Sequence, residues 1–159
     1  MLSSAVKQCA QLEGLIFDVD GTLSDTERDG HRVAFNLAFK EAGLDWYWNV
    51  KTYGLLLNVT GGKERIRYFI EEFQPAFEAP ADLDVFIRQL HQTKTRNYVA
   101  LLKSGGIPLR PGVERLLREA RAAKLRLGIA TTTTPENVTT LLSATLGVES
   151  IAWFEVIAL

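Results

Sequence analysis

The sequence predicts an α/β protein: a small parallel sheet interrupted by a long helical insertion. Three short apolar runs, at residues 15–17, 125–130 and 153–159, have the pattern of buried strands. A helical pattern separates the second run from the third, and strands that alternate with helices are typical of parallel sheets. Residues 28–105 have helical periodicity throughout and no strand signal, so we expect them to be inserted after the first strand.

The inserted block is expected to contain four helices. Apolar residues recur at helical spacing in each segment, and glycine or proline marks most of the ends. The last segment has the longest stripe, and this stripe includes one lysine, Lys94. The expected segments are Glu27–Glu41, Trp46–Leu57, the stretch from Gly61-Gly62 to Pro75, and the stretch from Pro80 to Gly105-Gly106.

The second half of the chain returns to alternating elements. Pro111-Gly112 begins a helix that carries Val113, Leu116, Leu117 and Ala120. The strand Leu125–Ala130 follows, and then a turn of four threonines. A helix from Pro135 is expected to point Val138, Leu141 and Leu142 inward and to end at Gly147, before the last strand, Trp153–Leu159.

Composition narrows the class of protein. The 159 residues suit about one domain, with 47% hydrophobic and 23% charged residues. The net charge of −1 gives no basic field for nucleic acid. The one cysteine, Cys9, cannot form an internal disulfide, and no apolar run approaches the roughly 20 residues that span a bilayer. With no signal-peptide pattern at the start, we expect a cytoplasmic protein with no nucleic-acid or membrane partner.

The main chemical motif is the string Asp18-Val19-Asp20-Gly21-Thr22-Leu23, directly after the first strand. Two carboxylates at i and i+2 can both reach the carboxyl edge of the sheet, where open α/β folds bind ligands. One can attack phosphorus and the other can transfer the leaving-group proton. Carboxylate oxygens also suit Mg²⁺. An isolated Asp-x-Asp is more often a plain turn, but the complete string after an apolar strand favours chemistry.

These residues carry a family resemblance. The string LIFDVDGTLSDT, Leu15–Thr26, resembles the first signature of the haloacid dehalogenase superfamily. Four further segments resemble its CbbY-like and β-phosphoglucomutase-like branch: Asp25–Asn36, Thr60–Ile66, Leu109–Gly112 and Ile129–Thr133. The similarity extends from about Leu12 to Ala158. It implies a Rossmann-like core formed by residues 1–27 and 107–159, with an all-helical cap domain at 28–106.

The resemblance also implies roles for core residues. Asp18 would be the nucleophile that forms an aspartyl-phosphate, and Asp20 the general acid and base. Both would contribute to a Mg²⁺ site, Asp20 through its backbone carbonyl. Thr131, with Thr132 beside it, would bind the phosphoryl group. From the residues alone, Thr131 more simply caps the helix that begins at Pro135.

In the cap, a glycine pair precedes two cations at a helix start, which suits an anionic group such as a second phosphate. From the residues alone, a solvated helix face is an equal alternative. His31 alone would more often fill the core or lie at the surface, but in the family this region faces the substrate. The expected substrate contacts are Glu27, His31, Gly61, Gly62, Lys63 and Arg65.

We therefore expect a Mg²⁺-dependent phosphatase that acts on a phosphorylated sugar, in particular a small bisphosphate. One alternative is a sugar-phosphate mutase that returns the phosphoryl group to substrate. Another is no enzyme at all: an inactive remnant of a truncated or split gene.

The end of the sequence motivates the last alternative. The chain stops inside the apolar run Phe154–Leu159, and the resemblance implies a lysine and an acidic pair beyond it. Without the rest of the core, Leu15–Phe17 would be an exposed sheet edge. We expect the isolated chain to be poorly stable unless a complementary C-terminal fragment covers that edge.

Overall fold

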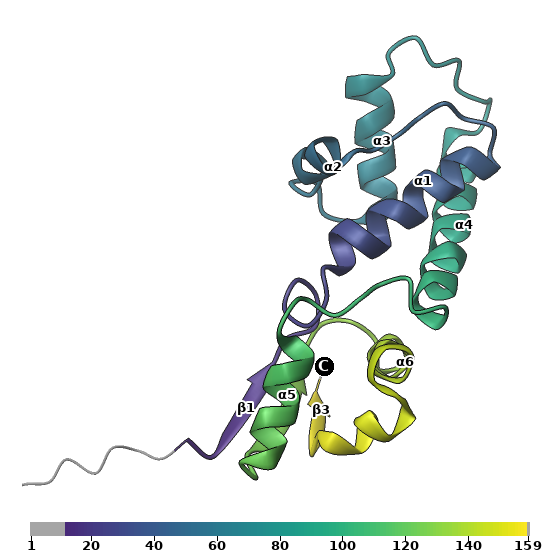
Figure 1. Cartoon of the computed structure of the whole chain (residues 1–159). Helices are drawn as coiled ribbons and strands as arrows, with labels where there is room; N and C mark the ends of the chain where they lie inside the picture. The colour runs from purple at the N-terminus through teal and green to yellow at the C-terminus, as the bar shows by residue number, and fades with distance from the viewer. Residues whose placement is uncertain (1–11, 159) are drawn as a thin grey trace, which may run out of the picture.

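The computed structural model describes residues 12–158, so Cys9 and Leu159 lie outside the described part. Two lobes are visible, one built on the sheet and one purely helical (Figure 1). The elements in chain order are β1 (Gly14–Phe17), the π-helix η1 (Thr26–His31), α1 (Arg32–Glu41), α2 (Val50–Leu56), α3 (Gly62–Phe73), α4 (Leu83–Lys103), α5 (Val113–Ala122), β2 (Arg126–Ala130), α6 (Pro135–Leu146), the 3₁₀ helix η2 (Val148–Trp153) and β3 (Val156–Ala158).

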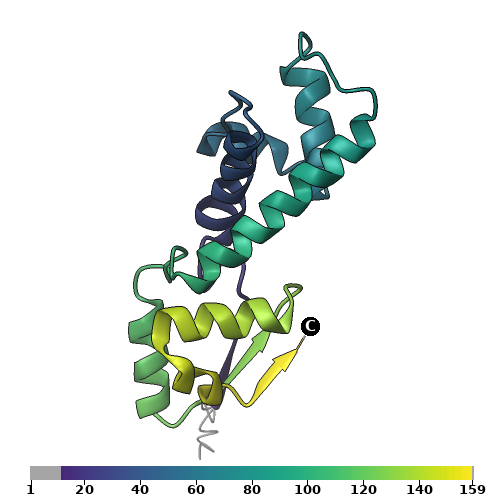
Figure 2. The same ribbon diagram turned by 90° about the vertical axis from the view of Figure 1, so that its right-hand side faces the viewer.

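The sheet is parallel, with the order β1-β2-β3, which confirms the predicted α/β class. Phe17 pairs with Ile129, so the ends of β1 and β2 are level. Alternate side chains of all three strands enter one apolar cluster, together with residues of α5 and α6. Both helices therefore cover the same face of the sheet (Figure 2). As expected, Val138, Leu141 and Leu142 of α6 are buried.

The other face of the sheet is bare among the described residues. Ile16 is 76% exposed and Val156 is 53% exposed, and they border a shallow hollow of about 280 Å³. The expectation that the first strand is buried is therefore wrong for Ile16. β1 also lies at the edge of this sheet, which is the position expected for Leu15–Phe17.

The helical lobe has its own aromatic core. Trp46 and Trp48 are buried and pack edge-on against Phe39 and Phe69. Two segments connect this lobe to the sheet: residues 21–31, the first crossing, and residues 104–112, the second crossing (Figure 1). Separate apolar clusters for the two lobes support the division at 28–106, which stays a prediction.

Two predicted element bounds and one predicted helix type need correction. The last strand starts at Val156 instead of Trp153, because residues 148–153 form a 3₁₀ helix. The second cap helix starts at Val50 instead of Trp46. Asn49 is its N-cap, because the Asn49 side chain accepts a hydrogen bond from the Thr52 amide at 2.9 Å. The segment Glu27–Glu41 is helical, but its first turn is a π-helix.

Within residues 12–158, none of the helices combines the length and the apolar character that crossing a membrane requires.

Candidate active site

The segment after β1 is a tight turn held by one carbonyl group. The backbone oxygen of Val19 accepts hydrogen bonds from the amides of Thr22, Leu23 and Ser24 at 3.0–3.3 Å. Gly21 has a φ of +79°, which glycine adopts without the steric cost of a Cβ atom. Val19 is buried, so the turn holds Asp18 and Asp20 beyond the carboxyl end of the strand.

The two carboxylates have different surroundings. Asp18 is exposed, whereas Asp20 is partly buried and accepts a hydrogen bond from the Thr26 hydroxyl at 2.6 Å. Burial raises the pKa of Asp20, and the charges of Asp18 and Glu27 raise it further, while the Thr26 bond opposes the change. A carboxyl with a raised pKa is suited to donate a proton.

Thr131 lies at the same edge of the sheet as the two aspartates. Because β1 and β2 are parallel and Phe17 pairs with Ile129, Asp18 is level with Ala130, one residue before Thr131. Thr131 is buried, and its hydroxyl accepts from the Thr133 amide at 3.3 Å. The helix cap is Thr134, whose hydroxyl accepts from the Asn137 amide, so the capping role considered for Thr131 is wrong. Its neighbour Thr132 is exposed in the turn.

One polar network in the cap begins at Glu27. The hydroxyl of Tyr53 donates to the Glu27 carboxylate at 2.6 Å and accepts from Arg65 at 3.0 Å. Arg65 also donates to the carbonyl oxygens of Leu56 and Val59. Burial and the bond to Glu27 raise the pKa of Tyr53, so the phenol stays protonated. The structure therefore brings Glu27 and Arg65 together through Tyr53.

A second cluster joins η1 to α4. Lys94 is buried, lies 2.9 Å from Nδ1 of His31, and packs over the rings of Phe35 and Tyr98. Burial lowers the pKa of Lys94 to about 8. Burial, followed by the charge of Asp20, raises the pKa of Tyr98. The charge of Glu27 raises the pKa of Asp20 and opposes the lowering at Lys94. The second cluster therefore lies close enough to Asp20 and Glu27 for their charges to influence it.

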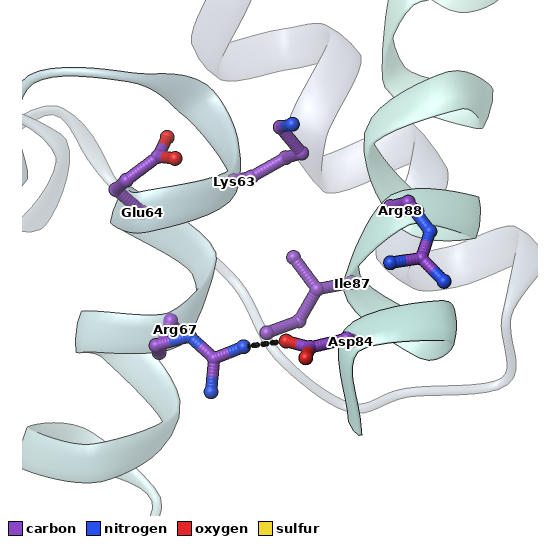
Figure 3. A pocket seen from close by; sticks show the side chains of 6 residues that line it. All are labelled: Lys63, Glu64, Arg67, Asp84, Ile87 and Arg88. Carbon is purple, nitrogen blue, oxygen red and sulfur yellow. Dashed lines mark hydrogen bonds and ion pairs between the residues drawn. The ribbon is translucent and has the colours of Figure 1, made fainter. Parts of the chain in front are cut away.

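The other predicted cap contacts lie at the start of α3, where Gly62 packs close to Phe35 of the second cluster. Gly61 is exposed with a φ of +94°, and Gly62 sits so close to His91 that an added Cβ would lie 2.6 Å from the ring. Lys63 borders a hollow between α3 and α4 together with Arg67, Arg88 and two carboxylates (Figure 3). Substrate contact by Gly61, Gly62 and Lys63 stays a prediction.

Sequence reasoning missed two residues. Lys94 was placed in the apolar stripe of its helix, and a lysine in such a stripe is itself the signal, because a buried lysine needs a partner. Tyr53 has no motif, and only the fold brings it to Glu27, 26 positions earlier.

Comparison with known proteins agrees with this geometry. The model of the haloacid dehalogenase-like hydrolases matches residues 12–158, and the chain belongs to that family. Among its relatives are the CbbY proteins of Cupriavidus necator, 49% identical over 87% of this chain, and of Rhodobacter capsulatus, 48% identical over 93%. The chain spans only 54% and 63% of the lengths of these two relatives.

Solved structures agree with the same family. A crystal structure of Rhodobacter sphaeroides CbbY in complex with phosphate has a TM-score of 0.67 and 44% identity, covering 92% of this chain and 63% of that protein. A CbbY mutant from the same organism, with the same values, is in complex with xylulose-(1,5)bisphosphate. The predicted α/β core with a helical insertion and the predicted family are therefore confirmed.

Proposed function

We propose that this chain forms the nucleophile-bearing part of a Mg²⁺-dependent phosphatase that acts on a small sugar phosphate or bisphosphate. The observation that carries the proposal is the common sheet edge of Asp18, Asp20 and Thr131, where Thr26 of the first crossing donates a hydrogen bond to Asp20. Its cytoplasmic location belongs to the same proposal.

The reaction has two steps. A carboxylate oxygen of Asp18 attacks phosphorus, the bond to the sugar oxygen breaks, and Asp20 gives its proton to that oxygen. The product is an aspartyl-phosphate and a free sugar hydroxyl. Water then attacks phosphorus, Asp20 takes a proton from the water, and Asp18 and inorganic phosphate are released. The partly buried Asp20, with its raised pKa, fits the acid role, and the exposed Asp18 fits the nucleophile.

The donor set fits Mg²⁺ in part. Asp18 and the backbone carbonyl of Asp20 offer the hard oxygen ligands that Mg²⁺ prefers, completed by water and substrate phosphate. Bound there, the ion would neutralise charge on the transferring phosphoryl group. Residues 12–158 contain no cluster of three or more His, Cys, Asp or Glu side chains able to hold a metal, so a further acidic ligand would come from elsewhere.

The cap chemistry supports an anionic, hydroxylated substrate. Lys94 is buried and Arg65 is half-buried, and partly desolvated cations bind phosphate more strongly than fully hydrated ones do. Glu27 accepts hydrogen bonds, which suits a sugar hydroxyl. The bisphosphate bound by the Rhodobacter sphaeroides relative has this chemistry.

Phosphate release tests the proposal. The protein is incubated with Mg²⁺ and a panel of sugar mono- and bisphosphates, and Asp18→Asn is the control. Release that Asp18→Asn abolishes supports the phosphatase. An Asp18-dependent phosphoenzyme that hydroxylamine cleaves, with transfer between sugar positions and no net phosphate release, would favour the mutase. No phosphoenzyme at all would favour the inactive remnant.

We also propose that a complementary C-terminal fragment covers the exposed edge at β1 together with the bare sheet face. Parallel sheets are normally covered on both faces, and here Ile16 and Val156 are largely exposed. The corresponding relatives are longer than this chain. The chain is co-expressed with the C-terminal part of a CbbY relative and tested for a stable complex. Ile16→Asp should disrupt that complex, whereas Leu55→Asp, at an exposed cap position, should not. Failure of the complex to form would contradict the proposal.

A further inference from the structure

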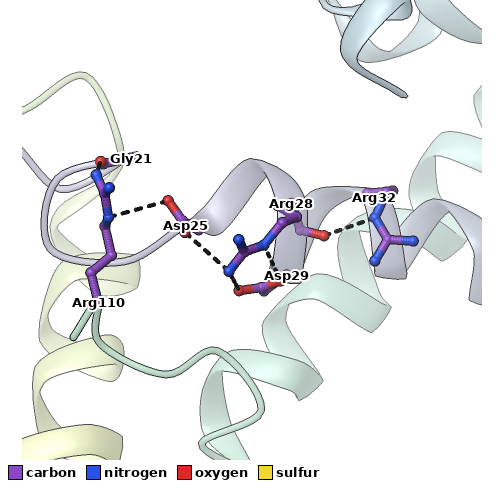
Figure 4. Close-up of polar contacts among 6 residues, drawn as sticks. All are labelled: Gly21, Asp25, Arg28, Asp29, Arg32 and Arg110. Carbon is purple, nitrogen blue, oxygen red and sulfur yellow. Dashed lines mark hydrogen bonds and ion pairs between the residues drawn. The ribbon is translucent and has the colours of Figure 1, made fainter. Parts of the chain in front are cut away.

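Arg110 lies in the second crossing, next to the turn that carries Asp20 (Figure 4). Its guanidinium donates from Nη1 to the backbone oxygen of Gly21, and its amide donates to the oxygen of Leu23 at 2.8 Å. The Val19 carbonyl accepts hydrogen bonds from amides of the turn itself, whereas Arg110 donates to carbonyl groups of the turn from a distant segment. One residue from a distant segment therefore binds two carbonyl groups of the turn.

The same guanidinium begins a chain of charges. Arg110 Nε lies 3.5 Å from the carboxylate of Asp25, whose other oxygen is 3.0 Å from Arg28. Arg28 in turn forms two hydrogen bonds of 2.8 Å with Asp29. Figure 4 shows the two arginines on either side of Asp25. The charges thus link the second crossing to the π-helix of the first.

Packing joins the two crossings beneath these charges. Gly30, in the π-helix, lies against Ile107 and Tyr98; an added Cβ would be 2.6 Å and 2.8 Å from their side-chain carbons. Ile107 is fully buried. The crossings therefore meet through a tight apolar contact and an ion-pair chain, and the turn with Asp20 is attached to both.

We infer that Arg110 is a positioning residue: it fixes the Gly21–Ser24 turn, and with it Asp20, against the junction of core and cap. Arg110 belongs both to the hydrogen bonds of the turn and to the chain of ion pairs, because its planar guanidinium binds the Gly21 carbonyl and the Asp25 carboxylate at the same time. Lysine keeps the charge but cannot reproduce that geometry. The mechanical part of this inference is independent of catalysis, and its effect on turnover rests on the proposed function.

Amide hydrogen exchange of the folded chain, alone or in complex with the complementary fragment, tests the mechanical part. In Arg110→Gln, exchange at the amides of Gly21–Ser24 should rise about tenfold, as expected for loss of a hydrogen bond to a charged donor. Arg110→Lys should show a rise at the same amides. The α6 amides should keep their rates in both variants. Arg115→Gln removes an exposed arginine of α5 and is the matched control, with no change expected.

Turn exchange within twofold of wild type would overturn the inference. An equal rise throughout the chain would also overturn it, because that result is general destabilisation. In the active assembly, Arg110→Gln should lower kcat about tenfold and leave KM within about twofold, because Arg110 positions Asp20 without touching substrate. If Arg110→Gln showed faster amide exchange at Gly21–Ser24 but an unchanged kcat, only the proposed effect of Arg110 on turnover would be refuted. Absence of turnover in the wild type would refute the proposed function and leave the exchange result standing.

Discussion

Lys94 Nζ lies 2.9 Å from Nδ1 of His31, and this pair joins the long cap helix to the π-helix of the first crossing. A charged lysine has no acceptor, so Nδ1 must accept and the proton of the neutral ring is on Nε2. His31 also stacks on Tyr98, with ring centroids 4.0 Å apart. A buried cation is therefore held where α4 packs on the π-helix of the first crossing.

Replacing both partners should separate binding from stability. In the double variant His31→Phe, Lys94→Met, apolar groups of similar size replace a buried polar pair, so the free energy of unfolding should stay within about 1.5 kcal/mol of wild type. Affinity for a sugar bisphosphate should fall at least about tenfold, because a desolvated cation is lost. Lys103→Met, at the exposed end of the same helix, is the control and should bind normally. Unchanged affinity in the double variant would refute the substrate role of Lys94.

The burial of His31 predicts a dependence of stability on pH. Burial, followed by the charge of Lys94, lowers the pKa of His31 from 6.5 to about 3. Between these values the unfolded chain binds a proton that the folded chain does not, so acidification favours unfolding. This residue should cost about 1.4 kcal/mol of unfolding free energy per pH unit below 6.5. Denaturant titrations at several pH values between 7 and 5 give the unfolding free energy as a function of pH. This free energy should fall less steeply with acidification in His31→Phe than in wild type, and equal pH dependence would refute the prediction.

Two glycines should respond oppositely to alanine. Gly30→Ala puts a Cβ into Ile107 and Tyr98 and should destabilise the fold by about 1–3 kcal/mol. Gly54→Ala, in α2 with nothing within 4 Å of the added Cβ, should stabilise it by about 0.5–1 kcal/mol. Thermal and denaturant unfolding measure both. A neutral Gly30→Ala would mean that the two crossings are less closely packed than described.

Tyr53→Phe should destabilise the fold without changing apolar packing. The ring stays in place, but Glu27 loses its 2.6 Å donor and Arg65 loses an acceptor. We expect a loss of about 1–3 kcal/mol in unfolding free energy, because a partly buried carboxylate is left with fewer partners. Tyr47→Phe is the control, since Tyr47 is 67% exposed, and it should change little. Equal effects of the two variants would show that the Tyr53 network contributes nothing.

Local sequence signals predicted much of the site. Asp18 and Asp20 follow the apolar strand β1. Thr131 follows β2, and because β2 runs parallel to β1, all three residues lie at the same edge of the sheet. The glycine pair before Lys63 is equally visible in the sequence, yet Gly62 packs against His91, and Lys63 borders a hollow between α3 and α4. The sequence at the start of α3 predicts that backbone amides and Lys63 are available to an anion. The packing of α3 on α4 decides which part of the protein surface these groups face.

The sequence by itself determined the order of elements, the parallel sheet and the two carboxylates, because apolar periodicity, glycine and proline act over a few residues. Only the tertiary structure decided that Lys94 meets His31 across 63 positions, that Tyr53 meets Glu27, and that Arg110 holds the turn at Gly21. It also decided that Ile16 faces solvent. Long-range contacts of this kind depend on how helices and strands pack in space, and no local pattern specifies them.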